Sequence, residues 1–186
     1  MSVVGCSGSG KSTFGRALHE RLGYRLVELD ALYHGPNWEP ATTEEFRAKV
    51  ADATCAEPWI VDGNYLTVRD LTWGRADTII WLDYSFPVCF SRVVRRTFRR
   101  WWRREVLWNE NRERLWWHFF RRDSLFLWVM KTHRSKRQRY AGVFASPESQ
   151  NKTLLRFETS AEAQEWLDTL QPHPEPPLAD SVQIQA

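Results

Sequence analysis

The chain has 186 residues, 42% of them hydrophobic, which is enough to fill the core of one domain. Its three cysteines are far apart and lack metal-ligand spacing, and no apolar run approaches the roughly 18 residues that cross a bilayer, so we expect a cytoplasmic protein with neither a signal peptide nor a membrane span. The net charge is only +3, yet residues 92–140 hold 14 arginines and 2 lysines against 4 acidic residues, so the rest of the chain is acidic.

The chain opens on VVGCSGSGKST, which supplies every fixed position of the phosphate-binding loop pattern G-x-x-x-x-G-K-[ST]. Glycines let successive N–H groups turn inward around an anion, Lys11 brings a positive charge to the outer phosphates, and the Ser12 hydroxyl can bind Mg²⁺. A chance match is the alternative, but the apolar residues before the loop and the helical pattern after it favour an ATP site. The residues expected to line it are Gly5, Cys6, Ser7, Gly8, Ser9, Gly10, Lys11, Ser12 and Thr13. Only four residues precede Gly5, which is short for a buried first strand, and the sequence leaves open whether the natural N-terminus lies upstream of Met1.

Apolar segments with strand character then alternate with helical patterns. The expected strands after the first are residues 24–30, 58–65, 77–83 and 152–157. Two of the expected helices have recognisable N-caps, Thr43 for the segment TTEEFRAKVADA and Ser160 for SAEAQEWLDTL. This alternation predicts a five-stranded parallel sheet with helices on both faces, which is a three-layer α/β/α fold. Ligands of such sheets bind at the carboxyl ends of the strands.

Two carboxylates are expected at that edge, beside the loop. Asp62 ends an apolar strand, where a carboxylate can hold Mg²⁺; the alternative is a turn-forming Asp-Gly pair. Asp30 ends another expected strand and could orient or deprotonate an acceptor hydroxyl, or simply be a solvated turn residue. His34 and Trp38 follow in the same loop, where they could bind the substrate or pack.

The basic block at 92–140 interleaves arginines with large aromatic residues. These are Trp101, Trp102, Trp108, Trp116, Trp117, Phe119, Phe120 and Trp128. Three interpretations are open: a lid whose arginines close over the transferring phosphates, a surface for single-stranded nucleic acid, or a solvated or partner-binding helix face. We expect one domain over 1–171 with the block as a lid insertion, followed by a disordered proline-rich tail at 172–186.

In this order, GCSGSGKST, LDALYHGPNW, IVDGNY, ADTIIWLDY, RVVRRTFRR, RRDSLFLW and KTHRSKRQRY resemble the adenylate-kinase-like P-loop proteins. They are most similar to the subgroup labelled DNA topology modulation protein. Over about residues 1–170, the resemblance implies a P-loop NTPase fold with a helical Arg-rich lid and kinase activity. DGNY is similar to the D-G-[FY]-P-R element that carries the Mg²⁺-linked Asp, here Asp62, but Asn64-Tyr65 replaces the Pro-Arg pair that helps hold a nucleoside monophosphate.

The resemblance also implies roles for residues outside the loop. LDALYH is similar to the acceptor-binding segment of gluconate and shikimate kinases, which implies a substrate role for Asp30. Arg122 and Arg134 resemble the paired lid arginines of nucleotide kinases, and Arg96 lies on the helix that enters the lid. Ser160 falls where the adenine pocket of the family closes.

We therefore predict an ATP-dependent phosphotransferase that uses Mg²⁺ and an unidentified small acceptor, as a monomer or dimer. The predicted catalytic residues are Lys11, Asp30, Arg122 and Arg134; the metal ligands are Ser12 and Asp62; the substrate-binding residues are Asp30, His34, Trp38 and Asn64. An ATP-binding, nucleic-acid-associated regulator is the first alternative. A loop-type hydrolase or switch without an acceptor is the second.

Overall fold

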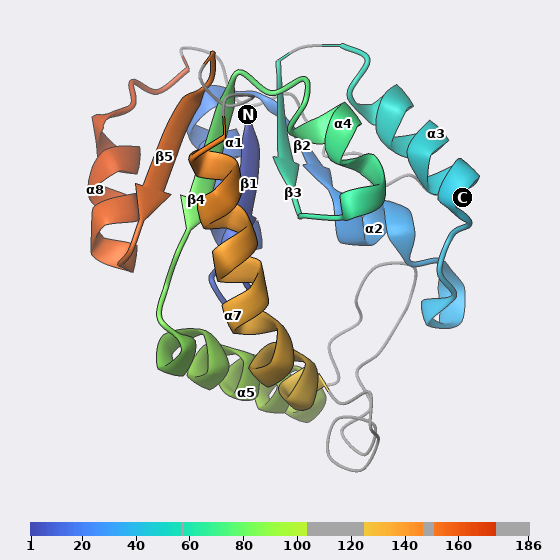
Figure 1. The fold of residues 1–186 in the computed structure, drawn as a ribbon, viewed down its shortest axis with the longest axis vertical. Helices are drawn as coiled ribbons and strands as arrows, with labels where there is room; N and C mark the ends of the chain where they lie inside the picture. The colour runs from blue at the N-terminus through green and yellow to red at the C-terminus, as the bar shows by residue number, and fades with distance from the viewer. Residues whose placement is uncertain (57, 104–124, 147–150, 174–186) are drawn as a thin grey trace.

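The computed structural model describes residues 1–56, 58–103, 125–146 and 151–173 (Figure 1). Its centre is a five-stranded sheet of order β2-β3-β1-β4-β5, and every neighbouring pair of strands is parallel. The strands are β1 (Ser2–Gly5), β2 (Arg25–Glu28), β3 (Trp59–Asp62), β4 (Thr78–Leu82) and β5 (Thr153–Phe157). The predicted five-stranded parallel sheet is therefore confirmed.

Helices cover both faces of this sheet, as the α/β/α prediction requires. They are α1 (Lys11–Leu22), α2 (Leu29–Tyr33), α3 (Thr43–Ala53), α4 (Arg69–Thr72), α5 (Phe86–Arg103), α7 (Leu125–Phe144) and α8 (Ser160–Thr169), with short 3₁₀ turns η1 (Pro36–Trp38) and η2 (Leu66–Val68). Helices α1 and α8 pack on one face, and α3 and α7 pack on the other. Helix α5 crosses below the carboxyl ends of the strands in Figure 1.

Successive residues of a strand contribute to two separate hydrophobic cores, because neighbouring side chains of a strand point to opposite faces of the sheet. In β4, Ile79 and Trp81 join the core beneath α3 and α7, while Ile80 and Leu82 join the core beneath α1 and α8. All four side chains are at most 2% exposed. A strand buried on both faces reads as a continuous apolar run, which is why TIIWL was recognisable in the sequence.

The helix starts differ from the sequence predictions by one residue each. Thr42, not Thr43, caps α3: its hydroxyl accepts from the N–H of Glu45, and the Glu45 carboxylate accepts from the Thr42 N–H. Thr159, not Ser160, caps α8 by accepting from the N–H of Glu162. At the start of each of these two helices, two hydroxyl residues are adjacent. The residue that acts as the N-cap is the one that lies three residues before a glutamate.

The expected lid begins and ends in helices that the structure describes. Helix α5 packs against α7, and α7 packs on the sheet through Tyr140 and Val143, which belong to a core cluster. The end of the expected insertion is thus part of the layer that covers the sheet. Residues 104–124, including Arg122, lie outside the described part of the chain, as does the predicted disordered tail beyond residue 173. Within the described ranges, no helix has the length and apolar character needed to cross a bilayer.

Candidate functional site

The loop between β1 and α1 turns sharply, and its turns depend on glycine. Gly8 and Gly10 have φ angles of 83° and 91°, in the left-handed region that side chains disfavour. The carbonyl of Cys6 accepts hydrogen bonds from the Ser9 N–H and from Nζ of Lys11, each at 3.1 Å. The ammonium of Lys11 is therefore folded back over the loop, at the first residue of α1, where the helix dipole also favours an anion.

Asp62 lies at the mouth of this loop because β3 pairs with β1, with Val3 opposite Asp62. Asp62 is 7% exposed, and Ser12 is the side chain whose hydrogen bonding acts on its carboxylate. Burial raises the pKa of Asp62 from 3.8 to about 6, against the opposing effects of the Lys11 charge and the Ser12 hydrogen bond. The two residues predicted as metal ligands, in the first turn of α1 and at the end of β3, thus lie at the same edge of the sheet.

This pair fits a Mg²⁺ ion. Mg²⁺ prefers oxygen ligands and is usually held by one or two protein oxygens, with phosphate and water completing its shell. Ser12 and Asp62 supply one hydroxyl and one carboxylate oxygen. Among the described residues, no group of three or more histidine, cysteine, aspartate or glutamate side chains could form an all-protein metal site, and such a site is not needed here.

Asp30 differs from its predicted position at a strand end. β2 stops at Glu28, and Asp30 is the second residue of the short helix α2, exposed to solvent. Its Oδ1 accepts a hydrogen bond of 2.7 Å from the Tyr65 hydroxyl. Burial, together with the negative charge of Asp30, raises the pKa of Tyr65, so that its hydroxyl stays protonated and donates. Tyr65 was not predicted as a site residue. The sequence signal that could have indicated a site role for it is its position three residues after Asp62.

The rings of Tyr33, Phe46 and Tyr65 form a cluster next to Asp30, here called the aromatic wall. The Tyr33 ring lies 4.8 Å from that of Tyr65 and 5.1 Å from that of Phe46, measured between centroids. His34 meets the ring of Trp38 edge-on at 5.4 Å, and burial lowers the pKa of His34. The predicted substrate residues His34 and Trp38 therefore belong to one aromatic cluster with Tyr33, next to the Asp30–Tyr65 pair.

Asn64 connects the loop to α7. Its amide Nδ2 donates to the Gly5 carbonyl at 3.4 Å and contacts the hydroxyl of Tyr140. These contacts anchor Asn64 at the base of the phosphate-binding loop. Its predicted role in substrate binding stays a prediction.

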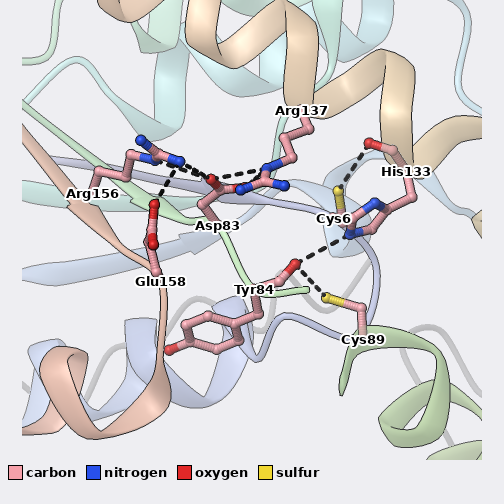
Figure 2. A network of polar contacts seen from close by, with 8 residues as sticks. All are labelled: Cys6, Asp83, Tyr84, Cys89, His133, Arg137, Arg156 and Glu158. Carbon is pink, nitrogen blue, oxygen red and sulfur yellow. Dashed lines mark hydrogen bonds and ion pairs between the residues drawn. The ribbon is translucent and has the colours of Figure 1, made fainter. Parts of the chain in front are cut away.

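A second polar network holds α7 against the end of β4 (Figure 2). The buried carboxylate of Asp83 forms ion pairs with Arg137 of α7 at 2.8 Å and with Arg156 of β5 at 2.6 Å. The next residue, Tyr84, offers its carbonyl to Nε2 of His133 at 3.1 Å and to the Cys89 thiol at 3.6 Å. This network was not predicted, because its members come from four separate segments of the chain.

The remaining predicted site residues are scattered. Arg134 is exposed on α7, Arg96 is half-buried on α5, and Ser160 is exposed at the start of α8. Arg92, which was not predicted, donates from its guanidinium to the Ser9 carbonyl in the loop at 3.4 Å and stacks over the Tyr84 ring. Arg92 of α5 thus contacts the phosphate-binding loop, although it was not among the predicted site residues.

Comparison with known proteins gives partial matches. No family model matches the chain. A shikimate kinase of Gloeobacter violaceus is 32% identical over 105 residues, covering 49% of this chain and 59% of the relative. A shikimate kinase of Rippkaea orientalis is 27% identical over 111 residues, covering 52% and 59%. The chain thus spans about three fifths of the length of the curated relatives it matches.

A solved structure, an unliganded sugar kinase from Janibacter sp. HTCC2649, aligns with 92% of this chain and 97% of its own, at 18% identity and a TM-score of 0.48. The sequence matches support a P-loop kinase-like protein. They do not bear on the DNA topology modulation subgroup, which stays a prediction.

Proposed function

We propose that the chain is an ATP-dependent phosphotransferase that acts on a small hydroxyl-bearing acceptor. The observation that carries the proposal is the buried carboxylate of Asp62, which the pairing of β3 with β1 places beside the phosphate-binding loop and its folded-back Lys11. Burial disfavours the ionised form of a carboxylate, so the charge of Asp62 lowers the stability of the folded chain unless a bound cation neutralises it. Its position at the mouth of a loop that matches the phosphate-binding pattern suits Mg²⁺ bound together with a nucleotide.

In phosphoryl transfer, the protein contributes mainly by positioning the reactants and by neutralising the charge of the transferring group. In the proposal, the backbone N–H groups from Gly8 to Thr13 bind the phosphates and Lys11 neutralises the outer ones. Ser12 and Asp62 would hold Mg²⁺, which supplies Lewis-acid stabilisation of the transferring group when bound. Arg122 and Arg134 stay the predicted lid arginines, and Ser160 the predicted neighbour of the adenine.

The acceptor is proposed to bind against the aromatic wall, with its hydroxyl at Asp30. The hydrogen bond from Tyr65 fixes the orientation of the Asp30 carboxylate and leaves its second oxygen, Oδ2, available to receive the proton of the attacking hydroxyl. Aromatic faces suit a ring-shaped acceptor. Because the curated relatives are named shikimate kinases, shikimate is the first acceptor to test.

The donor half is tested by isothermal titration calorimetry with ATP and Mg²⁺. Removing the Lys11 charge from the phosphate site is expected to weaken ATP binding by about 10- to 100-fold in Lys11→Ala, since a charge-assisted contact contributes about 1.5–3 kcal/mol. Lys49→Ala, on the exposed side of α3, is the matched control and should bind like the parent. Unchanged affinity in Lys11→Ala would show that this site assignment is wrong.

The acceptor half is tested by ADP release with a panel of shikimate, gluconate, nucleosides and nucleoside monophosphates. A kinase turns over faster with its acceptor, and Asp30→Asn is expected to lower that accelerated rate by about 10²- to 10⁴-fold while leaving ATP affinity intact. If no acceptor accelerates ADP release, the hydrolase or switch alternative is favoured.

A second candidate function rests on the surface of α5. Phe98, Trp101 and Trp102 are 44%, 48% and 81% exposed, on a helix that also exposes Arg95 and Arg99. Aromatic faces beside arginines can bind single-stranded nucleic acid through stacking and phosphate contacts. This is the feature that supports an ATP-binding, nucleic-acid-associated regulator.

The test is binding of a labelled single-stranded oligonucleotide at two salt concentrations. If this function exists, affinity falls steeply between about 50 and 200 mM salt, and Trp102→Ala loses roughly tenfold. Leu66→Ala, an exposed apolar residue on η2, is the control. No binding at the lower salt concentration would rule this function out.

A further inference from the structure

The segment from Asp62 to Tyr65, at the end of β3, contacts three parts of the candidate site within four residues. Asp62 lies beside the phosphate-binding loop as the predicted Mg²⁺ ligand. The side-chain amide of Asn64 donates to the carbonyl of Gly5, where β1 enters the loop, at 3.4 Å. The hydroxyl of Tyr65 donates to the Asp30 carboxylate at 2.7 Å. The position of this segment therefore affects the metal ligand, the loop and the acceptor carboxylate together.

Few backbone hydrogen bonds hold this segment in place. Between Asp62 and η2, the backbone is in neither a strand nor a helix. The Gly63 N–H donates to the Val3 carbonyl at 3.3 Å, and the Tyr65 carbonyl accepts from the Val68 N–H at 3.4 Å. Both distances are longer than those of most N–H···O hydrogen bonds. The contacts of the side chains in this segment therefore contribute strongly to where it lies.

A tyrosine of α7 holds Asn64 from the other side. The amide of Asn64 contacts the hydroxyl of Tyr140 as well as the loop. Tyr140 is 2% exposed, and its ring packs against those of Trp73 and Trp81, with centroids 5.7 and 5.6 Å away. Because its ring is enclosed in this way, the Tyr140 hydroxyl has little freedom to move. It is a fixed point against which Asn64 is placed.

The hydroxyl of Tyr140 has no part in the packing of α7. Its ring makes the contacts with the two tryptophans, and the ring of a phenylalanine would make the same contacts. A buried hydroxyl loses its hydrogen bonds to water, which is costly unless a protein group replaces them. Among the described residues, the side chain that contacts this hydroxyl is that of Asn64. The ring of Tyr140 therefore serves the fold, whereas its hydroxyl acts on the segment beside the candidate site.

We propose that Tyr140 is a positioning residue for phosphoryl transfer, which holds Asn64 and thereby aligns the segment from Asp62 to Tyr65 between the loop and Asp30. This inference rests on the proposed function, since it assigns the residue to that reaction. Tyr140 contacts neither the nucleotide nor the acceptor in this proposal. The loss of its hydroxyl should therefore affect the transfer step, which depends on alignment, more than the binding of ATP.

The kinetic experiment compares Tyr140→Phe, Tyr65→Phe and the double variant with the parent. The substrates are ATP, Mg²⁺ and shikimate, or the member of the acceptor panel that accelerates ADP release most. We expect Tyr140→Phe to lower kcat by about 3- to 10-fold, the effect of one neutral hydrogen bond, while the Kd of ATP in calorimetry changes by less than about twofold. Tyr24→Phe, just before β2 at the opposite end of the strands, is the control and should behave like the parent.

The double variant tests whether the two tyrosines act through the same segment. If Tyr140 positions the segment that carries Tyr65, the two effects on kcat are coupled. The double variant should then be slower than the slower single variant by less than about twofold. Two independent effects would instead multiply.

Amide hydrogen exchange separates this inference from the proposed function, because it needs neither nucleotide nor acceptor. In Tyr140→Phe, the Gly63 and Val68 amides, which are hydrogen-bonded at the two ends of the segment, should exchange about 3- to 10-fold faster than in the parent. The amides of α7 should exchange as in the parent. If no acceptor of the panel accelerates ADP release, the acceptor half of the proposed function fails, and this measurement still decides whether Tyr140 positions the segment.

Three results would overturn the inference. The first is exchange of the Gly63 and Val68 amides in Tyr140→Phe at the rates of the parent. The second is a double variant whose loss of kcat is the product of the two single losses. The third is faster exchange throughout α7 together with equal losses of kcat and ATP affinity, which a purely structural role of Tyr140 would produce.

Discussion

Replacing Asp62 by asparagine should stabilise the nucleotide-free chain, although Asp62 is a proposed metal ligand. The carboxylate is buried at the end of β3, and its pKa is raised from 3.8 to about 6. One pKa unit corresponds to about 1.4 kcal/mol, so the ionised carboxylate costs the folded chain about 3 kcal/mol relative to the unfolded chain. Asparagine keeps the shape and an acceptor for the Ser12 hydroxyl but carries no charge.

The sign of the effect sets its pH dependence. Because the folded pKa lies above the unfolded one, Asp62 contributes favourably to stability below about pH 4, and this contribution is lost as the pH rises through about 6. Asp62→Asn should therefore differ from the parent by less than about 1 kcal/mol near pH 4 and be more stable by about 3 kcal/mol above pH 7. Comparing the two proteins at each pH cancels the contributions of the other carboxylates.

The assay is urea unfolding without nucleotide or Mg²⁺, at several pH values between 4 and 8. Glu165→Gln, which neutralises an exposed carboxylate on α8, is the control and should change stability little. In parallel, Asp62→Asn should lose the Mg²⁺-dependent part of ATP binding. A stability difference between Asp62→Asn and the parent that stays constant from pH 4 to pH 8 would refute the reasoning, because it would mean that burial does not act on the charge.

Other perturbations test the scaffold of the site. Asp83→Asn should lower the free energy of unfolding by about 2 kcal/mol, less than a fully buried pair because Arg137 and Arg156 are 48% and 42% exposed, and urea unfolding measures it. Gly8→Ala should weaken ATP binding in calorimetry and lower the melting temperature. The reason is that the added Cβ would lie 2.2 Å from the Cys89 carbonyl, at a φ of +83° that side chains disfavour. A melting temperature equal to that of the parent would contradict this account of the loop. Thr42→Ala should cost about 1 kcal/mol through loss of the α3 cap, with no effect on ATP affinity.

The position of Asp62 shows what sequence reasoning could reach. Its place follows from two local signals, an apolar run that ends at a carboxylate and a loop pattern that ends in Lys-Ser. Parallel strand pairing then brings the two together, because the carboxyl ends of neighbouring parallel strands share one edge. The position of Asp30 was right to within two residues, and the difference is that β2 stops early and α2 begins at Leu29.

The basic block shows where such reasoning stopped. Arginine-rich helices with aromatic residues are consistent with a lid, a nucleic-acid surface or a solvated face, and periodicity alone does not say which side chains of α7 face the sheet. The structure buries Tyr140 and His133 and leaves Arg134 exposed. The lid itself stays a prediction, since its middle lies outside the described residues.

By itself, the sequence determined the phosphate-binding loop, the strand–helix alternation and the carboxylate beside the loop. Each of these depends on residues that are close together in the chain or on the regular geometry of a parallel sheet. Only the tertiary structure decided the hydrogen bond from Tyr65 to Asp30 and the Asp83 ion pairs. These contacts join segments that are far apart in the chain. They depend on how the helices pack against the two faces of the sheet, and no local sequence pattern encodes that packing.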